Sequence, residues 1–301
     1  MESKKDILAE IERLFSLKGM VEAYEEIAAS RMRRIRDSVL KNRDFLFGLN
    51  EVFHQVQASY KSEIQRLMKT KKLKDPSKIT FLKKNGKKIY ILLTSNSGLY
   101  GSIIKRTFNL FLENIKKENC DAAVIGKLGK EMFEAEKLNS NVAFFNFPDN
   151  KMDYDQFKKI MDHILQYEEI DVFHGQFQTV ITQKPVKSSI SGTEIPGVKK
   201  EDAAQAQTKQ INLKYLFEPS LEKIMAFFET EIFSSIFEQT IHESELAKFS
   251  SRMVVLDQAV ENIRGNLTKT EYLMRKFKHR RGNRKQSSRL SGMMLWKARY
   301  S

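Results

Sequence analysis

Cysteine and long apolar runs are scarce in this chain, and each shortage excludes a class of protein. The single cysteine, Cys120, excludes a disulfide framework and indicates a reducing compartment. Because no histidine-bearing motif accompanies it, we interpret Cys120 as a buried spectator thiol. No apolar run approaches the ~20 residues that span a bilayer, and the opening MESKKD lacks the apolar segment of a signal peptide. We therefore expect a soluble protein with no direct membrane insertion.

Acidic residues are missing from the end of the chain. The 301 residues include 52 lysines and arginines against 38 aspartates and glutamates, a net charge of +14. No acidic residue follows Glu271, whereas the basic ones that follow it are Arg275, Lys276, Lys278, Arg280, Arg281, Arg284, Lys285, Arg289, Lys297 and Arg299. Such a surplus predicts an acidic partner: nucleic acid, anionic lipid or an acidic protein.

Proline is absent from both flanks, because all five prolines lie between Pro76 and Pro219. Long helices exclude proline from their interiors, so both flanks are free to be continuous helices. Apolar residues on each flank recur every three or four positions, which is typical of a heptad seam. The N-terminal seam is Ala28, Met32, Ile35, Val39, Asn42, Leu46, Leu49, Phe53, Val56 and Tyr60. The C-terminal seam is Leu246, Phe249, Met253, Leu256, Val260, Ile263, Leu267, Thr270, Met274 and Phe277.

Two such stripes would leave apolar side chains in water unless they pack together. We therefore predict a long antiparallel coiled coil formed by the first and last quarters of the chain. Asn42 lies on the seam, where it either fixes the register of the two helices or is frayed and partly exposed. The stripe ends at Phe277, so the residues beyond it are expected to face another partner.

Between the flanks, strand-like and helix-like segments alternate, which predicts a small Rossmann-like α/β domain with a mainly parallel sheet. The expected strands cover 87–95, 122–126, 141–147 and a long strand region at 171–190, and the expected helices cover 103–117, 129–138 and 154–167. A loop is expected at 191–210, and the segment 212–220 is expected to add an edge strand and to open the last helix. The predicted division is 1–74 (N-terminal helix), 75–212 (α/β domain) and 213–301 (C-terminal helix with a basic tip).

The stretch TSNSGLYGS, Thr94 to Ser102, is the best candidate for a phosphate-binding loop because it joins a strand to a helix. It has neither the Walker A pattern nor G-x-G-x-x-G, so we interpret Gly98 and Gly101 as residues of a tight turn. GKLGK, Gly126 to Lys130, is interpreted as a plain turn as well. The five histidines are scattered, and no metal site or catalytic constellation is expected. We therefore predict no bound cofactor.

Six segments, in order, resemble the gamma subunit of F-type ATP synthases. The matching residues are Ala28-Ala29-Ser30-Arg31-Met32-Arg33; Thr94, Ser95, Gly98, Leu99 and Gly101; Ile125, Gly126, Lys127, Gly129 and Phe133; Phe177, Gln183 and Pro185; Tyr215, Phe217, Glu218 and Pro219; and Arg252, Met253, Leu256, Asp257 and Ala259. The chain is divergent: Asn96-Ser97, Tyr100, Lys248, Tyr24 and the C-terminal tip depart from the usual pattern.

The resemblance implies a non-catalytic central rotor shaft whose coil stands inside a ring of alpha and beta subunits. It further implies that the α/β domain contacts an epsilon-like subunit and a membrane rotor ring, at the cytoplasmic face of the cell membrane. Candidate contacts with the ring are Tyr24, Arg31, Arg33, Arg34, Lys248, Arg252, Arg280, Arg281, Arg284, Lys285 and Gln286. A polar catch against beta would be formed by Arg280–Arg281 or by Arg284–Gln286.

Two other interpretations remain open at this point. The +14 charge and basic tail also suit a coiled-coil protein that binds nucleic acid, and a nucleotide-dependent enzyme would use the loop at Thr94–Ser102. Within the resemblance, the divergent tip leaves room for a specialised motor that only hydrolyses ATP.

Overall fold

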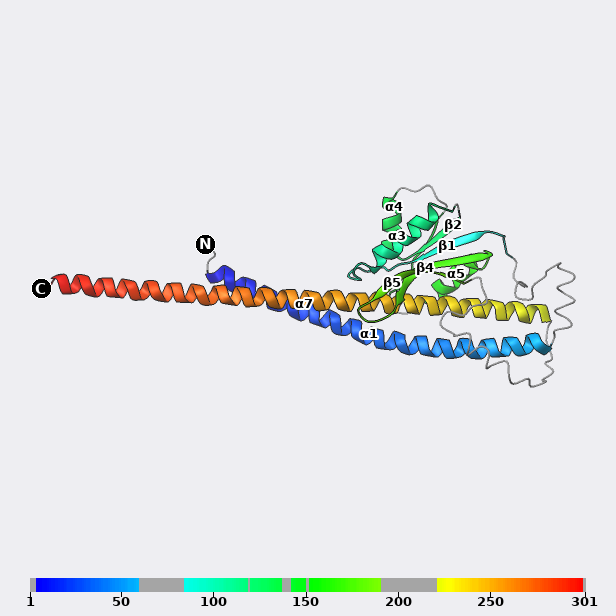
Figure 1. Ribbon diagram of the computed structural model, residues 1–301, viewed down its shortest axis with the longest axis horizontal. Helices are drawn as coiled ribbons and strands as arrows, with labels where there is room; N and C mark the ends of the chain where they lie inside the picture. Colours follow the sequence, from blue (N-terminus) through cyan, green and yellow to red (C-terminus); the bar gives the residue numbers. More distant parts are fainter. Residues whose placement is uncertain are drawn as a thin grey trace. The chain divides into compact units, whose positions relative to one another are not determined.

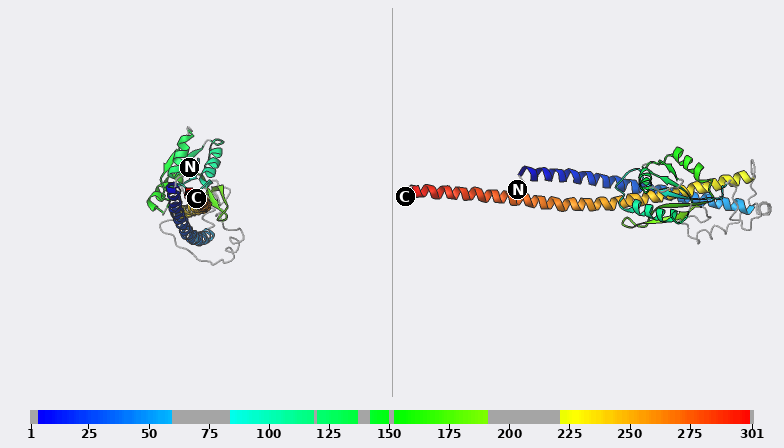
Figure 2. Two further views of the ribbon diagram at one scale, coloured as in Figure 1. Left: turned by 90° about the vertical axis from the view of Figure 1, so that its left-hand side faces the viewer. Right: turned by 90° about the horizontal axis from the view of Figure 1, so that it is seen from above.

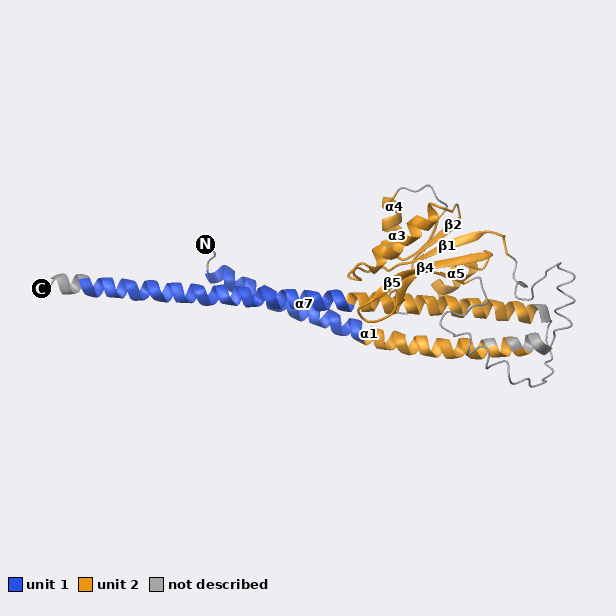
Figure 3. Cartoon of the chain, viewed as in Figure 1, with its two compact units in different colours: residues 1–29, 253–301 blue, residues 30–252 orange. Residues whose placement is uncertain are grey.

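The computed structural model describes residues 4–59, 84–118, 120–136, 142–149, 152–190 and 221–299 (Figure 1). The expected loop at 191–210 and edge strand at 212–220 lie outside these residues. The chain forms two compact units, residues 30–252 and residues 1–29 together with 253–301 (Figure 3). The two long helices α1 (Lys4–Ser59) and α7 (Leu221–Arg299) contribute to both units. The division into 1–74, 75–212 and 213–301 stays a prediction.

A five-stranded sheet lies within residues 30–252, with the order β3-β2-β1-β4-β5. The strands are β1 (Lys88–Leu93), β2 (Asp121–Ile125), β3 (Val142–Phe145), β4 (Glu169–Phe177) and β5 (Gln183–Ser189). The first four are parallel, as expected from strands that alternate with helices. The expected strand region at 171–190 is two strands instead: β4 and β5 pair antiparallel, because residues 178–182 form a turn.

Both faces of this sheet are covered, because successive side chains of a strand point to opposite sides. Tyr90 and Leu92 of β1 pack with Phe108 and Phe111 of α3 (Ile103–Ile115), and α4 (Lys127–Ala135) covers the same face. Ile89 of β1 packs on the other face, within a cluster that α5 (Tyr154–Ile164) and α7 share. Figure 1 shows the sheet between these helices. The three-layer arrangement confirms the predicted α/β domain.

Within residues 30–252, α1 packs along α7: Asn42 and Phe53 of the predicted N-terminal seam meet α7 at residues that precede its predicted seam. Asn42 on α1 donates to the carbonyl oxygen of Ser235 at 3.0 Å and to Oε1 of Gln239 at 3.3 Å on α7. Further along α1, the Phe53 ring lies 6.0 Å from that of Phe228. The residue numbers of the contacts decrease along α7 as they increase along α1, so the two helices are antiparallel. Figures 1 and 2 show them side by side in this unit. Asn42 is therefore a paired seam residue and not a frayed one.

The other unit, residues 1–29 with 253–301, contains a second stretch of the same kind of seam. Leu14 of α1 packs with Ile263 and Leu267 of α7, and Glu22 lies 3.7 Å from Arg264. Leu256, Val260 and Met274 of the α7 stripe are also buried. Phe277 is half-buried, and every residue from 278 to 294 is exposed. The stripe therefore ends where the sequence predicts.

The turn between β2 and α4 brings the GKLGK segment against the end of β1. Gly126 has a φ of +105°, and a Cβ there would lie 2.5 Å from Oγ1 of Thr94. A Cβ on Gly129 would lie 2.6 Å from the same atom and 2.8 Å from Cγ1 of Val124. Gly129 N–H donates to that Thr94 hydroxyl at 3.1 Å, and the hydroxyl donates to the carbonyl oxygen of Ile125 at 2.7 Å. Both glycines are thus required by close packing.

The glycines of this fold provide a matched test. We expect Gly129→Ala to lower the free energy of unfolding by about 1–3 kcal/mol, because the added methyl overpacks a buried contact. Gly265 lies inside α7 with no atom within 4 Å of the position of its Cβ. Gly265→Ala should therefore raise stability by about 0.5–1 kcal/mol. Urea titration followed by circular dichroism measures both, and equal effects would contradict the proposed packing at Gly129.

Candidate functional site

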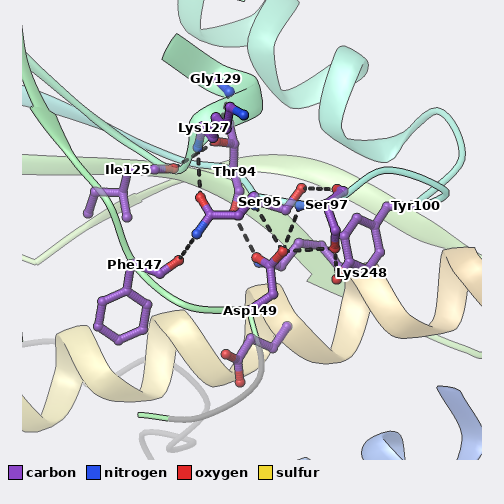
Figure 4. A network of polar contacts seen from close by, with 12 residues as sticks. Thr94, Ser95, Ser97, Tyr100, Ile125, Lys127, Gly129, Phe147, Asp149 and Lys248 are labelled. Carbon is purple, nitrogen blue, oxygen red and sulfur yellow. Dashed lines mark hydrogen bonds and ion pairs between the residues drawn. The ribbon is translucent and has the colours of Figure 1, made fainter. Parts of the chain in front are cut away.

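The loop after β1 lies where an α/β sheet of this topology usually binds its ligand. Strands β2 and β4 flank β1, and the chain crosses between the two sides after β3. Ligands of doubly wound sheets bind outside the carboxyl ends of the strands at such a switch point. The residues that follow β1, β2 and β3 meet at this edge in Figure 4. The contacts of Thr94–Ser102 therefore decide whether the loop can hold a phosphate.

A carboxylate of the chain itself occupies the N–H groups of this loop. The backbone N–H groups of Asn96 and Ser97 donate to Oδ2 of Asp149 at 2.9 and 2.8 Å, and the Ser97 hydroxyl donates to the same oxygen at 2.9 Å (Figure 4). Asp149 lies in the loop between β3 and α5. A phosphate would need these same donors. Here they connect the loop after β1 to the loop after β3, and we call this cluster of contacts the joint.

The side chain of Asn96 ties the joint to two neighbouring loops. Its Nδ2 donates to the carbonyl oxygen of Phe147 at 2.9 Å and to Oδ1 of Asn146 at 2.7 Å. Its Oδ1 accepts from the backbone N–H of Lys127 at 2.8 Å, at the start of α4. One amide thus joins the residues that follow β1, β2 and β3.

Lys248 of α7 reaches into this joint from the helix side. Its Nζ donates to the carbonyl oxygen of Thr94 at 3.0 Å and lies 3.9 Å from Oδ1 of Asp149. Only 8% of Lys248 is exposed. A buried ammonium group is costly unless it is paired, so Lys248 and Asp149 need one another. Lys248 therefore holds the sheet edge against α7.

Arg252, one turn further along α7, contacts the loop at Gly98 and Tyr100. Its guanidinium donates to the carbonyl oxygen of Gly98 at 2.5 Å and lies 3.9 Å from the centre of the Tyr100 ring. Tyr100 in turn packs edge-on against Phe249, with ring centres 5.7 Å apart. Burial raises the pKa of the Tyr100 hydroxyl. Stacking and hydrogen bonding together fix the tip of the loop on α7.

The two loop glycines do not have equal roles. Gly101 has a φ of +61°, which supports the predicted turn function. The neighbouring left-handed position is Leu99, at φ +67°, and not Gly98. A Cβ on Gly98 would meet nothing within 4 Å. Neither conformation nor space explains a glycine at position 98.

The structure places the other candidate contacts in separate regions. Lys248 and Arg252 meet at the joint, within residues 30–252. In the same unit, Arg31 and Arg34 line an open groove of about 500 Å³ between α1, α7 and the residues around Met152, and Arg33 is exposed on α1. In the unit of residues 1–29 and 253–301, the exposed candidates are Tyr24, Arg280, Arg281, Arg284, Lys285 and Gln286.

Side chains of both charges line the groove. They are Arg31, Arg34 and Lys41 of α1, Glu238, His242 and Glu245 of α7, and Asp149. His242 lies 3.6 Å from Oε1 of Glu238 and 3.4 Å from Oε2 of Glu245. Burial alone would lower the pKa of His242, but the two carboxylates outweigh it and raise the pKa to about 9. His242 is therefore protonated at neutral pH.

Sequence reasoning missed Asp149 and the depth at which Lys248 is buried. The available signal for Asp149 was its position directly after an expected strand, because carboxyl ends of parallel strands meet at one edge of the sheet. In a helix with charges on most sides, nothing separated Lys248 from exposed lysines. Within the described residues, no group of three or more His, Cys, Asp and Glu side chains could hold a metal.

Comparison with known proteins identifies the family of the chain. The ATP synthase family model matches residues 3–280, which is most of the chain. The chain belongs to the ATP synthase gamma family. Gamma-family relatives include the ATP synthase gamma chains of Desulfitobacterium hafniense, 22% identical over 87% of this chain and 88% of the relative, and of Halothermothrix orenii, 23% identical over 87% and 88%. A chain in the central stalk and c-ring structure of Tetrahymena thermophila mitochondrial ATP synthase has the same fold. Its TM-score is 0.52 at 16% identity, covering 80% of this chain and 99% of that one.

The Lys248–Asp149 pair can be tested by a double-mutant cycle on the full chain. We expect Lys248→Met to lower the free energy of unfolding by about 1–3 kcal/mol, because it leaves Asp149 buried without its cation. In an Asp149→Asn background the same substitution should cost clearly less, as coupled neighbours require. The control is Lys269→Met, at an exposed position of the same helix. Additive costs would show that the two residues do not interact.

The raised pKa of His242 predicts a pH dependence of stability. A group whose pKa is raised on folding, here from 6.5 to about 9, adds stability that is complete below pH 6.5. This stability is lost as the pH rises through about 9. We expect His242→Gln to flatten the decline in the free energy of unfolding across that interval. His279→Gln, at an exposed position of α7, is the matched control and should leave the decline unchanged. Identical pH profiles for all three proteins would contradict the proposed ion pairs.

Proposed function

We propose that this chain is the non-catalytic central rotor shaft of an F-type rotary ATPase. The observation that carries the proposal is the closed sheet edge. Asp149, Lys248 and Arg252 fill the place where an α/β domain of this order would bind a nucleotide, and they fasten the loop to α7. A domain fastened in this way to a long helix can turn with it. Membership of the gamma family supplies the corresponding function.

The partners follow from that role. In this proposal a ring of F-type alpha and beta subunits surrounds the coil, and the α/β domain contacts an epsilon-like subunit and the membrane rotor ring. The complex would lie at the cytoplasmic face of the cell membrane. No helix in the described ranges is both long and apolar enough to cross a membrane.

The contacts with the ring would come from exposed side chains. Tyr24 is 47% exposed, and Arg33 and Arg34 are exposed on α1. Arg31, half-buried at the groove, would contribute at its edge. Lys248 and Arg252 already contact the loop after β1, so in this proposal they transmit force between the coil and the α/β domain. The remaining contacts with the ring would come from exposed residues near the end of α7: Arg280, Arg281, Arg284, Lys285 and Gln286.

An ATP synthase and a motor that only hydrolyses ATP both need such a shaft. The nucleic-acid alternative is less favoured, because the gamma family accounts for 3–280, including the start of the basic stretch. The enzyme alternative is weakened by the occupied donors of Asn96 and Ser97.

Purification from the native source tests the proposal. We expect a tagged full-length chain to recover alpha- and beta-type subunits bearing Walker motifs, together with ATPase activity that the chain alone lacks. The control is a tagged, unrelated basic protein of similar charge, which excludes capture driven by charge alone. Recovery of nucleic acid without those subunits would contradict the shaft function.

A further inference from the structure

Residues 275–294 of α7 form a basic stretch. Every residue from 278 to 294 is exposed, and no acidic residue follows Glu271. Its basic residues are Arg275, Lys276, Lys278, Arg280, Arg281, Arg284, Lys285 and Arg289. None of these makes an ion pair with another described residue. We call residues 275–289 the basic tip.

The charges of the basic tip surround the helix on all sides. At about 100° per residue, no gap between neighbouring basic positions around the axis exceeds roughly 100°. Arg281 and Lys285 even lie on the side that carries the buried seam at Ile263, Leu267 and Met274. A second helix would need apolar residues there, so the partner of the tip meets charge on this side as well.

A helix that binds a flat or grooved surface has a different pattern. Helices in a DNA groove or on a membrane present one binding face, and the opposite face differs in character. Like charges four residues apart also destabilise an isolated helix. The tip has four such pairs: 276 with 280, 280 with 284, 281 with 285, and 285 with 289. Acidic groups on several sides at once would relieve this repulsion.

We infer that the partner encloses the basic tip and presents acidic side chains around its whole circumference. This inference rests on the proposed function, in which the enclosing partner is the inner wall of the alpha and beta ring. A tip that carries charge on every side keeps a favourable contact at each angle as it turns. The tip then makes similar electrostatic contacts on all sides of the helix. It does not form a catch on one side through Arg280–Arg281 or Arg284–Gln286.

Two matched triple variants separate these arrangements. Each variant removes three charges that follow one another at four-residue spacing. The first is Lys276→Gln/Arg280→Gln/Arg284→Gln, and the second is Arg281→Gln/Lys285→Gln/Arg289→Gln. Their centres lie roughly 140° apart around the helix at 100° per residue. Each full-length variant is assembled with the alpha- and beta-type subunits, and its rate of dissociation from the immobilised ring is measured at rising NaCl concentrations. Arg280→Lys/Arg284→Lys keeps the charge and serves as the control.

We expect both triple variants to dissociate faster by a similar factor, on the order of tenfold at low salt, with the difference lost at high salt. The lysine control should behave as the unmodified chain. An effect confined to one triple variant would overturn the inference in favour of a one-sided catch, and no effect in either would show that the charges are unused. Circular dichroism should show no loss of helix, because removal of like-charge pairs does not weaken it.

Failure of the proposed function gives a different result. The unmodified chain would then not assemble with the alpha- and beta-type subunits at all. Salt-dependent binding of the isolated full chain to a DNA duplex, weakened by either triple variant, would assign the tip to nucleic acid. Both results would overturn the enclosing acidic wall.

Discussion

The buried ammonium group of Lys248 is the contact on which the joint between the sheet and α7 depends. It donates to the carbonyl oxygen of Thr94 after β1 and lies close to the carboxylate of Asp149. That carboxylate accepts hydrogen bonds from the backbone N–H groups of Asn96 and Ser97, in the loop after β1. A charge in this position is stable only while its partners stay in place. The N–H groups that a nucleotide-binding protein would leave free for phosphate are therefore occupied by a carboxylate of the chain itself. The same contacts attach the α/β domain to α7.

The pairing of α1 and α7 supplies the other half of the arrangement. In residues 30–252, Asn42 bonds across the helix pair, and in the second unit Leu14 packs on Ile263 and Leu267. The apolar side chains stabilise the pair, whereas the amide of Asn42 favours one register. Beyond Phe277 apolar packing gives way to exposed positive charge. Packing within the chain thus ends near Phe277, and in the proposed shaft the exposed segment beyond it contacts the partner.

Much of the fold follows from periodicity in the sequence. The four parallel strands, the helices between them and both seams were predictable, because repeats of two and of three to four residues have direct structural meanings. The hairpin of β4 and β5 was missed, since an unbroken β-rich segment does not show where it turns. The joint was only half predictable: the loop stood out, but the Asp149 contact depends on residues 52 positions apart meeting at one edge. The position of Asp149 after an expected strand places it at this edge of the sheet, but it does not specify which N–H groups Asp149 contacts.

Rotation of the α/β domain relative to the ring is the most direct test of a shaft. A bead can be attached through a cysteine introduced at Glu134, a residue exposed on α4, in the complete complex held to a surface by its beta-type subunits. A shaft predicts rotation of the bead in one direction on addition of ATP, in step with hydrolysis. Continued hydrolysis with the bead fixed would contradict it.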